Sequence, residues 1–212
     1  MIAIKVFRDT VSGFTHFGGA VASIVGTVFL AMNWGGDAEK LIVYLIFGVS
    51  MIALFSASAT YHLVTGPKRL VRVCHILDHC MIYVLIAGSY TPIVSLVFTG
   101  KLKWGYIIGI WAFALCGIIM KSFWTGRFRL VSTIIYLVMG WSIVFAIVPL
   151  VKALAAGGTV LFIIGGVFYT IGGIIYAIKK PNIFKYFGFH ELFHIFVLLG
   201  AAAHFFMVYY FI

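Results

Sequence analysis

Charged residues are scarce in this chain, and acidic residues are almost absent. Only 9% of the 212 residues are charged and only five are Asp or Glu, whereas 64% are hydrophobic. A soluble domain carries about 25% charged residues. Because the chain has too few charges to cover a surface that faces water, we expect lipid around it. A soluble enzyme or a soluble binding domain is thereby excluded.

Cysteine is also scarce, and the charge that exists is mostly of one sign. Cys74, Cys80 and Cys116 show no paired spacing, which argues against a disulfide framework. The net charge of +10 and the pI of about 9.7 are values common among nucleic-acid-binding proteins. Here, however, the basic residues lie in short segments between apolar runs, where they set membrane topology and contact anionic lipid. We therefore expect no nucleic-acid partner.

Long apolar runs are what the chain has in abundance. A membrane-spanning helix needs about 20 apolar residues, and the sequence contains seven runs of about that length. They cover approximately residues 13–33, 41–64, 75–98, 104–123, 130–151, 159–178 and 187–212. We predict an all-α integral membrane protein, a single domain built as a seven-transmembrane helix bundle.

The basic residues fall unevenly on the two sides of these runs. Eleven lie on the side of the N-terminus, namely Lys5, Arg8, Lys68, Arg69, Arg72, Lys121, Arg127, Arg129, Lys179, Lys180 and Lys185. Four lie on the other side, namely Lys40, Lys101, Lys103 and Lys152. Because cytoplasmic loops carry the excess of Lys and Arg, we predict a cytoplasmic N-terminus and, with seven spans, an extracellular C-terminus.

Several ionisable residues lie just inside the ends of the apolar runs, where burial is expensive and a partner or a cavity is expected. His62, Asp78 and His190 each lie five or six residues from a basic residue of the cytoplasmic side. If the residues between are helical, all three lie roughly 7–9 Å inside the basic layer. The topology rests on Lys and Arg alone, yet it brings these separate polar groups to one depth.

The spacing of these residues suits metal coordination. His190 and His194 are four residues apart and share one helix face, and Ser58 and His62 repeat that spacing. Three neutral imidazoles with one open position form the usual zinc site of hydrolytic enzymes. We predict that His62, His190 and His194 bind Zn²⁺. We further predict that Asp78 orients a water molecule and accepts its proton, and that Ser58 adds a hydrogen bond to the water or to a substrate.

The remaining polar residues leave alternatives open. His75 and His79 also have a spacing of four and could be ligands instead, although His75 lies closer to the interface. His16 is a candidate for a supporting contact from the first span. His204 lies too far along the chain to share the same ion and is expected to hydrogen-bond between helices. Glu191 is expected to meet a basic residue of the preceding loop, or the interface.

Three sequence elements together resemble a known family. They are Ser58-Ala-Thr-Tyr-His62, then His75-Ile-Leu-Asp78-His79 leading to Ala87-Gly88-Ser89-Tyr90-Thr91-Pro92, then His190-Glu-Leu-Phe-His194. In this order they are similar to the haemolysin III family, the bacterial branch of the progestin and adipoQ receptor superfamily, which includes the adiponectin receptors. The resemblance covers essentially the whole chain.

That resemblance implies a seven-helix protein of the cell membrane with a cytoplasmic N-terminus. It also implies zinc at His62, His190 and His194, with Asp78 and Ser58 close by. The chain departs from the family at its start. The family often places a Glu and an Asn before a Thr-His pair, where this chain has Asp9, Ser12 and Thr15-His16.

Three functions fit these features. The first is a zinc-dependent hydrolase acting on a membrane lipid amide or ester, which the superfamily's resemblance to alkaline ceramidases favours. The second is a sensor or regulator of membrane lipid, in which zinc is structural and couples spans two, three and seven. The third is the cytolysin that the family name implies. Seven resident apolar spans argue against a secreted pore-former.

The charge asymmetry generates a topology prediction. A reporter fused after Ile212 should behave as extracellular, and one inserted between Gly66 and Arg72 should behave as cytoplasmic, because Lys and Arg concentrate on the side of that loop. Protease protection or a compartment-specific reporter measures both positions. A cytoplasmic signal from the C-terminal fusion would contradict the orientation.

Overall fold

The computed structural model describes residues 8–123, 129–184 and 187–212, which form helices and no β-strand. The helices are α1 (Thr10–Met32), α2 (Ala38–Leu63), α3 (Lys68–Val97), α4 (Gly100–Phe123), α5 (Arg129–Trp141), the 3-10 helix η1 (Ser142–Ala146), α6 (Ile147–Ala153), α7 (Ala156–Ile178) and α8 (Phe189–Phe211). Within the described residues, seven segments are long and apolar enough to span a membrane, if α5, η1 and α6 are taken together as one span. The predicted all-α, seven-span architecture is confirmed.

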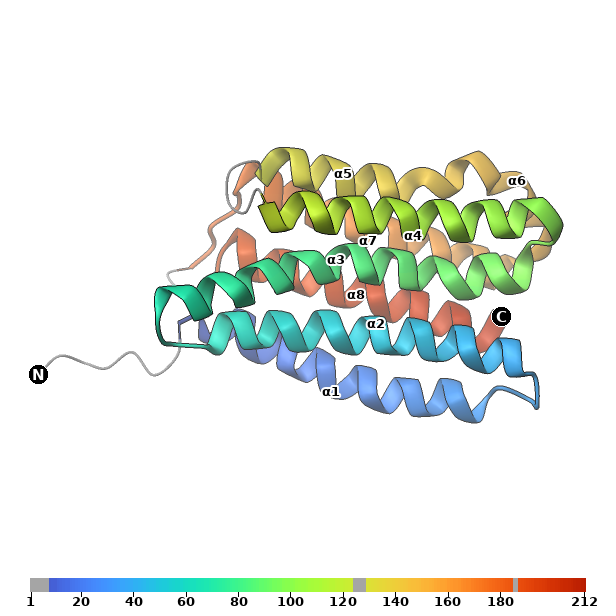
Figure 1. The fold of residues 1–212 in the computed structure, drawn as a ribbon, viewed down its shortest axis with the longest axis horizontal. Helices are drawn as coiled ribbons and strands as arrows, with labels where there is room; N and C mark the ends of the chain where they lie inside the picture. Colours follow the sequence, from blue (N-terminus) through green and yellow to red (C-terminus); the bar gives the residue numbers. More distant parts are fainter. Residues whose placement is uncertain (1–7, 124–128, 185–186) are drawn as a thin grey trace, which may run out of the picture.

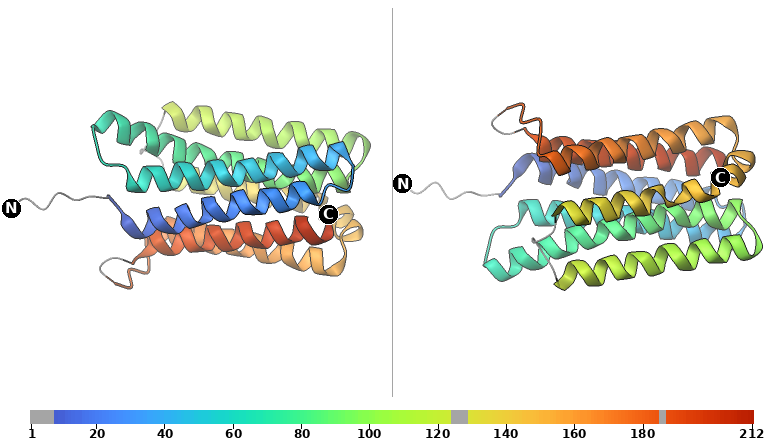
Figure 2. Two further views of the ribbon diagram at one scale, coloured as in Figure 1. Left: turned by 90° about the horizontal axis from the view of Figure 1, so that it is seen from below. Right: turned by 90° about the horizontal axis from the view of Figure 1, so that it is seen from above.

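The helices run side by side along the long axis of the molecule (Figures 1 and 2). The α2–α3 connection, the start of α1 and the start of α8 lie at one end, and the C-terminus lies at the other. The end of α2 and the starts of α3 and α8, which carry His62, Asp78 and His190, therefore lie at the same end of the bundle. Which end faces the cytoplasm stays a prediction from the charge count.

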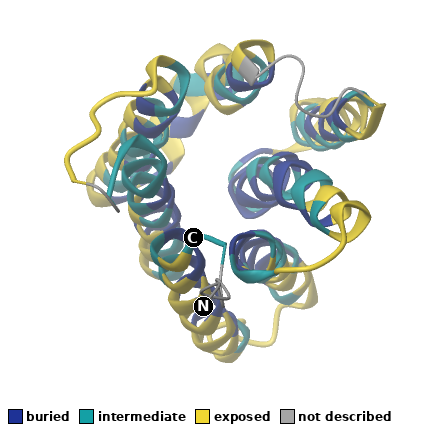
Figure 3. Ribbon diagram, turned by 90° about the vertical axis from the view of Figure 1, so that its left-hand side faces the viewer, coloured by how far each residue is buried: buried dark blue, intermediate teal, exposed yellow. Residues whose placement is uncertain are grey.

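The third span is the most deeply buried. In α3, 67% of the apolar window is buried, against 22% in α4. α2 packs on α1 and α3, α8 packs on α7, and α8 also contacts α1 and α3. Seen along the helices, buried residues face the interior and exposed residues face outward (Figure 3). α3 and α8 thus bring their polar side chains to the inside of the bundle.

The first span, α1, places small residues toward the bundle and large apolar residues outward. Its buried positions are mostly small, namely Ser12, Gly13, His16, Gly19, Ala20, Ser23, Gly26, Thr27 and Leu30. Its exposed positions include Phe14, Phe17, Val21, Ile24, Val25, Val28 and Phe29. A water-soluble helix has the opposite pattern. In lipid, helices associate by close packing of small residues while large apolar side chains face the acyl chains, so α1 is built for a bilayer.

The fifth span is interrupted in its middle, which the sequence analysis did not predict. The α-helix ends at Trp141, the 3-10 turn η1 follows, and α6 begins at Ile147. Pro149 lies in the first turn of α6. Proline has no N–H to donate and its ring clashes with the carbonyl four residues before it. Pro149 therefore disfavours an unbroken α-helix at this point, and the 3-10 turn η1 lies immediately before α6.

A tyrosine from the third span stabilises the interruption. The Tyr90 hydroxyl donates to the Gly140 carbonyl over 2.7 Å and accepts a hydrogen bond from the Ile143 amide over 3.0 Å. The Gly140 carbonyl and the Ile143 amide are backbone groups at the junction of α5 and η1, where the hydrogen-bond pattern of the helix changes. Since lipid offers no replacement partner, Tyr90 fixes the shape of the fifth span against α3.

We expect Tyr90→Phe to lower the free energy of unfolding by about 1–2 kcal/mol, because it leaves backbone groups unpaired inside the bundle. Unfolding of the purified protein in detergent measures the change. The matched control is Tyr44→Phe, whose buried hydroxyl makes no hydrogen bond within the described chain. An equal loss in both variants would show that the Tyr90 hydrogen bonds contribute nothing.

Candidate metal centre

Three histidines converge where α2 ends and α8 begins. His62 lies in the last turn of α2, and His190 and His194 lie in the first two turns of α8. One ring nitrogen from each lies within 4.8 Å of the others. His62 and His194 are buried, and His190 is half-buried. The structure therefore brings together the three residues that the sequence analysis selected as ligands.

Hydrogen-bond partners determine which nitrogen faces the site. His194 Nδ1 lies 3.3 Å from the Ser12 carbonyl oxygen. A carbonyl can only accept, so Nδ1 carries the proton and Nε2 keeps its lone pair. His62 Nδ1 lies 3.1 Å from Asp9 Oδ2, a charge contact that is not aligned as a linear hydrogen bond. The carboxylate likewise favours the proton on Nδ1 of His62, as the outer carboxylates of metal-binding histidines do.

One pair of ring nitrogens lies at the separation expected of two ligands of one metal ion. His62 Nε2 and His190 Nε2 are 3.2 Å apart. Tetrahedral ligands at 2.0–2.1 Å from zinc are separated by roughly 3.3–3.4 Å. Two lone pairs at this distance repel each other unless a proton or a cation lies between them. His62, His190 and His194 can therefore hold a metal ion.

Asp9 also belongs to this site, although the sequence analysis names it only where the chain departs from the family's opening motif. It caps the start of α1, and its backbone N–H donates to the His62 carbonyl over 2.9 Å. Burial raises the pKa of its carboxyl, but the interactions with His62 and Ser12 outweigh this and lower the pKa to about 2. Asp9 is thus an anion at neutral pH. The signal in the sequence was an acidic N-cap directly before the first span.

The two residues predicted to act beside the metal face the same interior space. Asp78 and Ser58 both line a cavity that His190 and His194 also line. Asp78 Oδ2 lies 3.3 Å from His79 Nδ1. The buried Ser58 hydroxyl interacts with the Asp78 carboxylate, although no hydrogen bond of standard geometry joins the two.

His75 and His79, the alternative ligands, lie outside the converging group. His79 Nδ1 faces the His75 carbonyl at 3.0 Å, and its Nε2 lies 3.4 Å from the Tyr176 hydroxyl. The His75 ring stacks on Tyr61 with 4.8 Å between centroids. Their contacts place these two histidines beside Asp78, where His79 supports the carboxylate.

His16 and Glu191 connect the first span to the centre. The His16 ring stacks on His194 with centroids 3.7 Å apart and planes 10° apart. Glu191 accepts hydrogen bonds from the Gly188 amide over 2.7 Å and from the Ser12 hydroxyl over 3.2 Å. Lys185, the basic residue considered for Glu191, lies outside the described residues. Glu191 therefore joins α8 to α1 through neutral donors.

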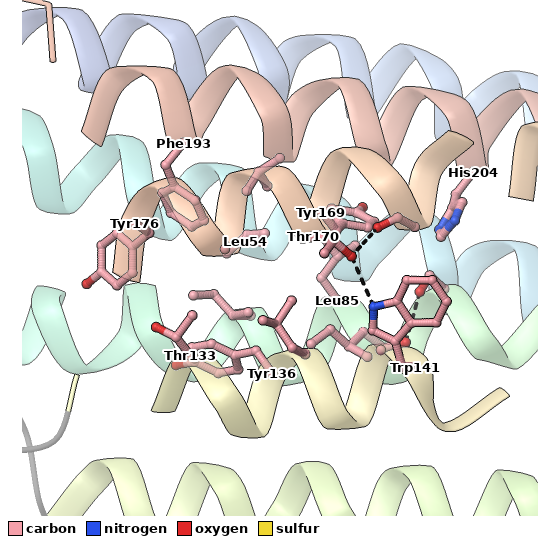
Figure 4. A pocket seen from close by; sticks show the side chains of 18 of the residues that line it. Leu54, Leu85, Thr133, Tyr136, Trp141, Tyr169, Thr170, Tyr176, Phe193 and His204 are labelled. Carbon is pink, nitrogen blue, oxygen red and sulfur yellow. Dashed lines mark hydrogen bonds between the residues drawn. The ribbon is translucent and has the colours of Figure 1, made fainter. Parts of the chain in front are cut away.

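The cavity extends from the histidines along the inside of the bundle. Its volume is about 400 Å³, and apolar side chains of α3, α5, η1, α7 and α8 form most of its wall. Figure 4 shows Tyr176, Phe193 and Thr133 toward one end and Tyr169, Thr170, Trp141 and His204 toward the other. A volume in the range of about 300–1,000 Å³ is typical of sites for small ligands. The candidate metal centre thus opens onto a long apolar chamber.

Comparison with known proteins agrees with these features. Residues 4–205 match the family model described as "Haemolysin-III related". The chain is 40% identical over 211 residues to the "Hemolysin-3 homolog" of Bacillus subtilis (strain 168), covering 98% of this chain and 95% of the relative. It is 36% identical to "Hemolysin-3" of Bacillus cereus, covering 98% and 93% of the two chains.

A human protein is also similar. "Monocyte to macrophage differentiation factor" of Homo sapiens is 29% identical over 211 residues, covering 95% of this chain and 83% of that protein. The family match spans nearly the whole chain, and the seven apolar spans agree with it. The chain therefore belongs to the haemolysin III family of multi-pass membrane proteins.

Proposed function

We propose that this protein is a zinc-dependent hydrolase that cleaves an amide or ester bond of a membrane lipid. The observation that carries the proposal is that two members of the three-histidine group, His190 and His194, line an apolar cavity that a carboxylate and a serine hydroxyl also line. The cavity would hold the acyl chain, and the polar end would hold the bond to be cleaved.

The donor set favours a catalytic over a structural zinc. Structural zinc sites usually have four protein ligands, whereas catalytic sites have three and keep one position open. Among the described residues, the converging group consists of His62, His190 and His194 alone. Zinc at this position would supply Lewis-acid polarisation of the scissile carbonyl.

The protein's own residues would do the remaining work. Asp78 would accept the proton of the attacking water, and the contact with His79 would hold its carboxylate toward the cavity. The Ser58 hydroxyl would donate to the substrate oxygen. The apolar wall would exclude bulk water and align the acyl chain, so that the reacting bond lies next to Asp78.

The ligand assignment is tested by metal content. Single replacement of His62, His190 or His194 by Ala should remove most of the bound zinc, because each leaves a vacancy among three ligands. His204→Ala is the control and should keep its zinc, since His204 Nε2 is instead bonded to the Phe162 carbonyl on α7. Metal analysis of the purified proteins measures both. Full zinc content after joint replacement of His190 and His194 would contradict the assignment.

The role of Asp78 is tested by Asp78→Asn, which keeps the side-chain shape but removes the basic oxygen. We expect zinc content to stay near the parent value, while hydrolysis of a lipid amide or ester falls by about 10²–10⁴-fold, the usual contribution of a general base. Zinc content, melting temperature and hydrolysis are measured on one preparation.

The structural alternative gives a different result for the same variant. If Asp78 only held the helices together, the melting temperature would fall and activity would decline in proportion. A variant with unchanged zinc, stability and hydrolysis would contradict the role proposed for Asp78.

A further inference from the structure

At the end of the cavity far from His190 and His194, two polar side chains each have an atom without a hydrogen-bond partner within the described chain. Tyr169 of α7 and His204 of α8 both line the cavity there. The Tyr169 hydroxyl and His204 Nδ1 are buried and have no hydrogen-bond partner within the described chain. Neighbouring polar groups differ, since Trp141 Nε1 donates to Thr170 Oγ1 over 3.0 Å. Tyr169 and His204 thus differ from the Trp141–Thr170 pair at the same end of the cavity.

The chemistry of the two unpaired atoms is determined by their surroundings. His204 Nε2 lies 3.3 Å from the Phe162 carbonyl oxygen. Because a carbonyl accepts only, Nε2 carries the proton and Nδ1 is an acceptor with a free lone pair. The Tyr169 hydroxyl can donate or accept. One group that both donates and accepts would satisfy the two atoms together, and an alcohol hydroxyl is such a group.

Both rings pack closely against the backbone of the neighbouring helix. A Cβ on Gly200 would lie 2.8–2.9 Å from the Tyr169 ring, so this ring lies directly against the backbone of α8. A Cβ on Gly165 would lie 2.3–2.4 Å from the His204 ring, so that ring lies against the backbone of α7. Each helix thus holds the polar ring of the other in a glycine-sized recess.

We propose that Tyr169 and His204 form a distal subsite that binds a hydroxyl group on the acyl chain of a lipid occupying the cavity. This inference deepens the proposed function and rests on it. His204 follows His194 by ten residues of α8, which separates the subsite from the metal centre by about 15 Å. The preferred lipid therefore carries its hydroxyl well along the chain, far from the bond that is cleaved. A lipid with a plain chain leaves both polar atoms buried and unpaired, which weakens its binding.

Binding of two matched fatty acids tests the subsite without requiring turnover. The purified, zinc-loaded protein is titrated with stearic acid and with hydroxystearic acid whose hydroxyl lies near the middle of the chain. Calorimetry or native mass spectrometry gives the two affinities. We expect the hydroxylated acid to bind roughly tenfold more tightly, the effect of pairing one buried polar group. In Tyr169→Phe this preference should disappear while stearic acid still binds, which also reports that the variant is folded.

The matched control is Tyr44→Phe, which removes another buried, unpaired hydroxyl outside the cavity lining and should keep the preference. Equal affinity of the parent protein for both acids would mean that water, and not a lipid hydroxyl, hydrogen-bonds to the Tyr169 hydroxyl and His204 Nδ1. That result would overturn the subsite alone. Binding of neither acid would overturn the acyl-chain cavity, and with it both the subsite and the proposed lipid substrate. Loss of the preference in Tyr44→Phe would also overturn the assignment to Tyr169.

Discussion

A bilayer contains no water with which an interior polar atom can bond, and the rest of this structure depends on that constraint. Each backbone polar group of a spanning helix must find its partner inside the protein. At the fifth span, Tyr90 of α3 supplies the partners that the interrupted backbone needs. At the histidine group, His62 Nδ1 lies against the Asp9 carboxylate, and His194 Nδ1 lies within hydrogen-bond distance of the Ser12 carbonyl oxygen. The ring nitrogens that face inward then lie close to one another, and this makes the group a candidate metal centre.

The sequence predicted the fold and the convergence of His62, His190 and His194, because both follow from patterns that can be recognised in the sequence alone. Runs of apolar residues identify spans by length alone. The convergence of His62, Asp78 and His190 followed from topology, although one of its assumptions held only in part. The residues from Arg72 to Asp78 are helical because α3 begins at Lys68, whereas α2 ends at Leu63 and α8 begins at Phe189. The three histidines nevertheless converge.

What the sequence did not predict depends on contacts between distant segments. Asp9 resembles any acidic residue before a helix until its distance to His62 is known, since 53 residues of chain separate them. The unpaired atoms of Tyr169 and His204 are equally invisible, because both residue types usually find partners when buried. The interruption of the fifth span had a local signal in Pro149, but proline near a helix start is compatible with a regular helix. Its position became decisive only through the packing of Tyr90.

In α1 the small residues are buried and the large ones are exposed, and this affects which substitutions the protein tolerates. In a soluble helix, the large interior side chains are the sensitive ones, and the surface accepts most replacements. Here the reverse holds along α1. Val21 and Ile24 face outward and can exchange for other aliphatic residues with little penalty, since acyl chains adapt to their shape. A single methyl on Gly19 would instead meet Leu198 at 2.5 Å and Phe55 at 3.2 Å, on two other spans. The smallest residues of α1 thus determine which neighbouring helices it can pack against.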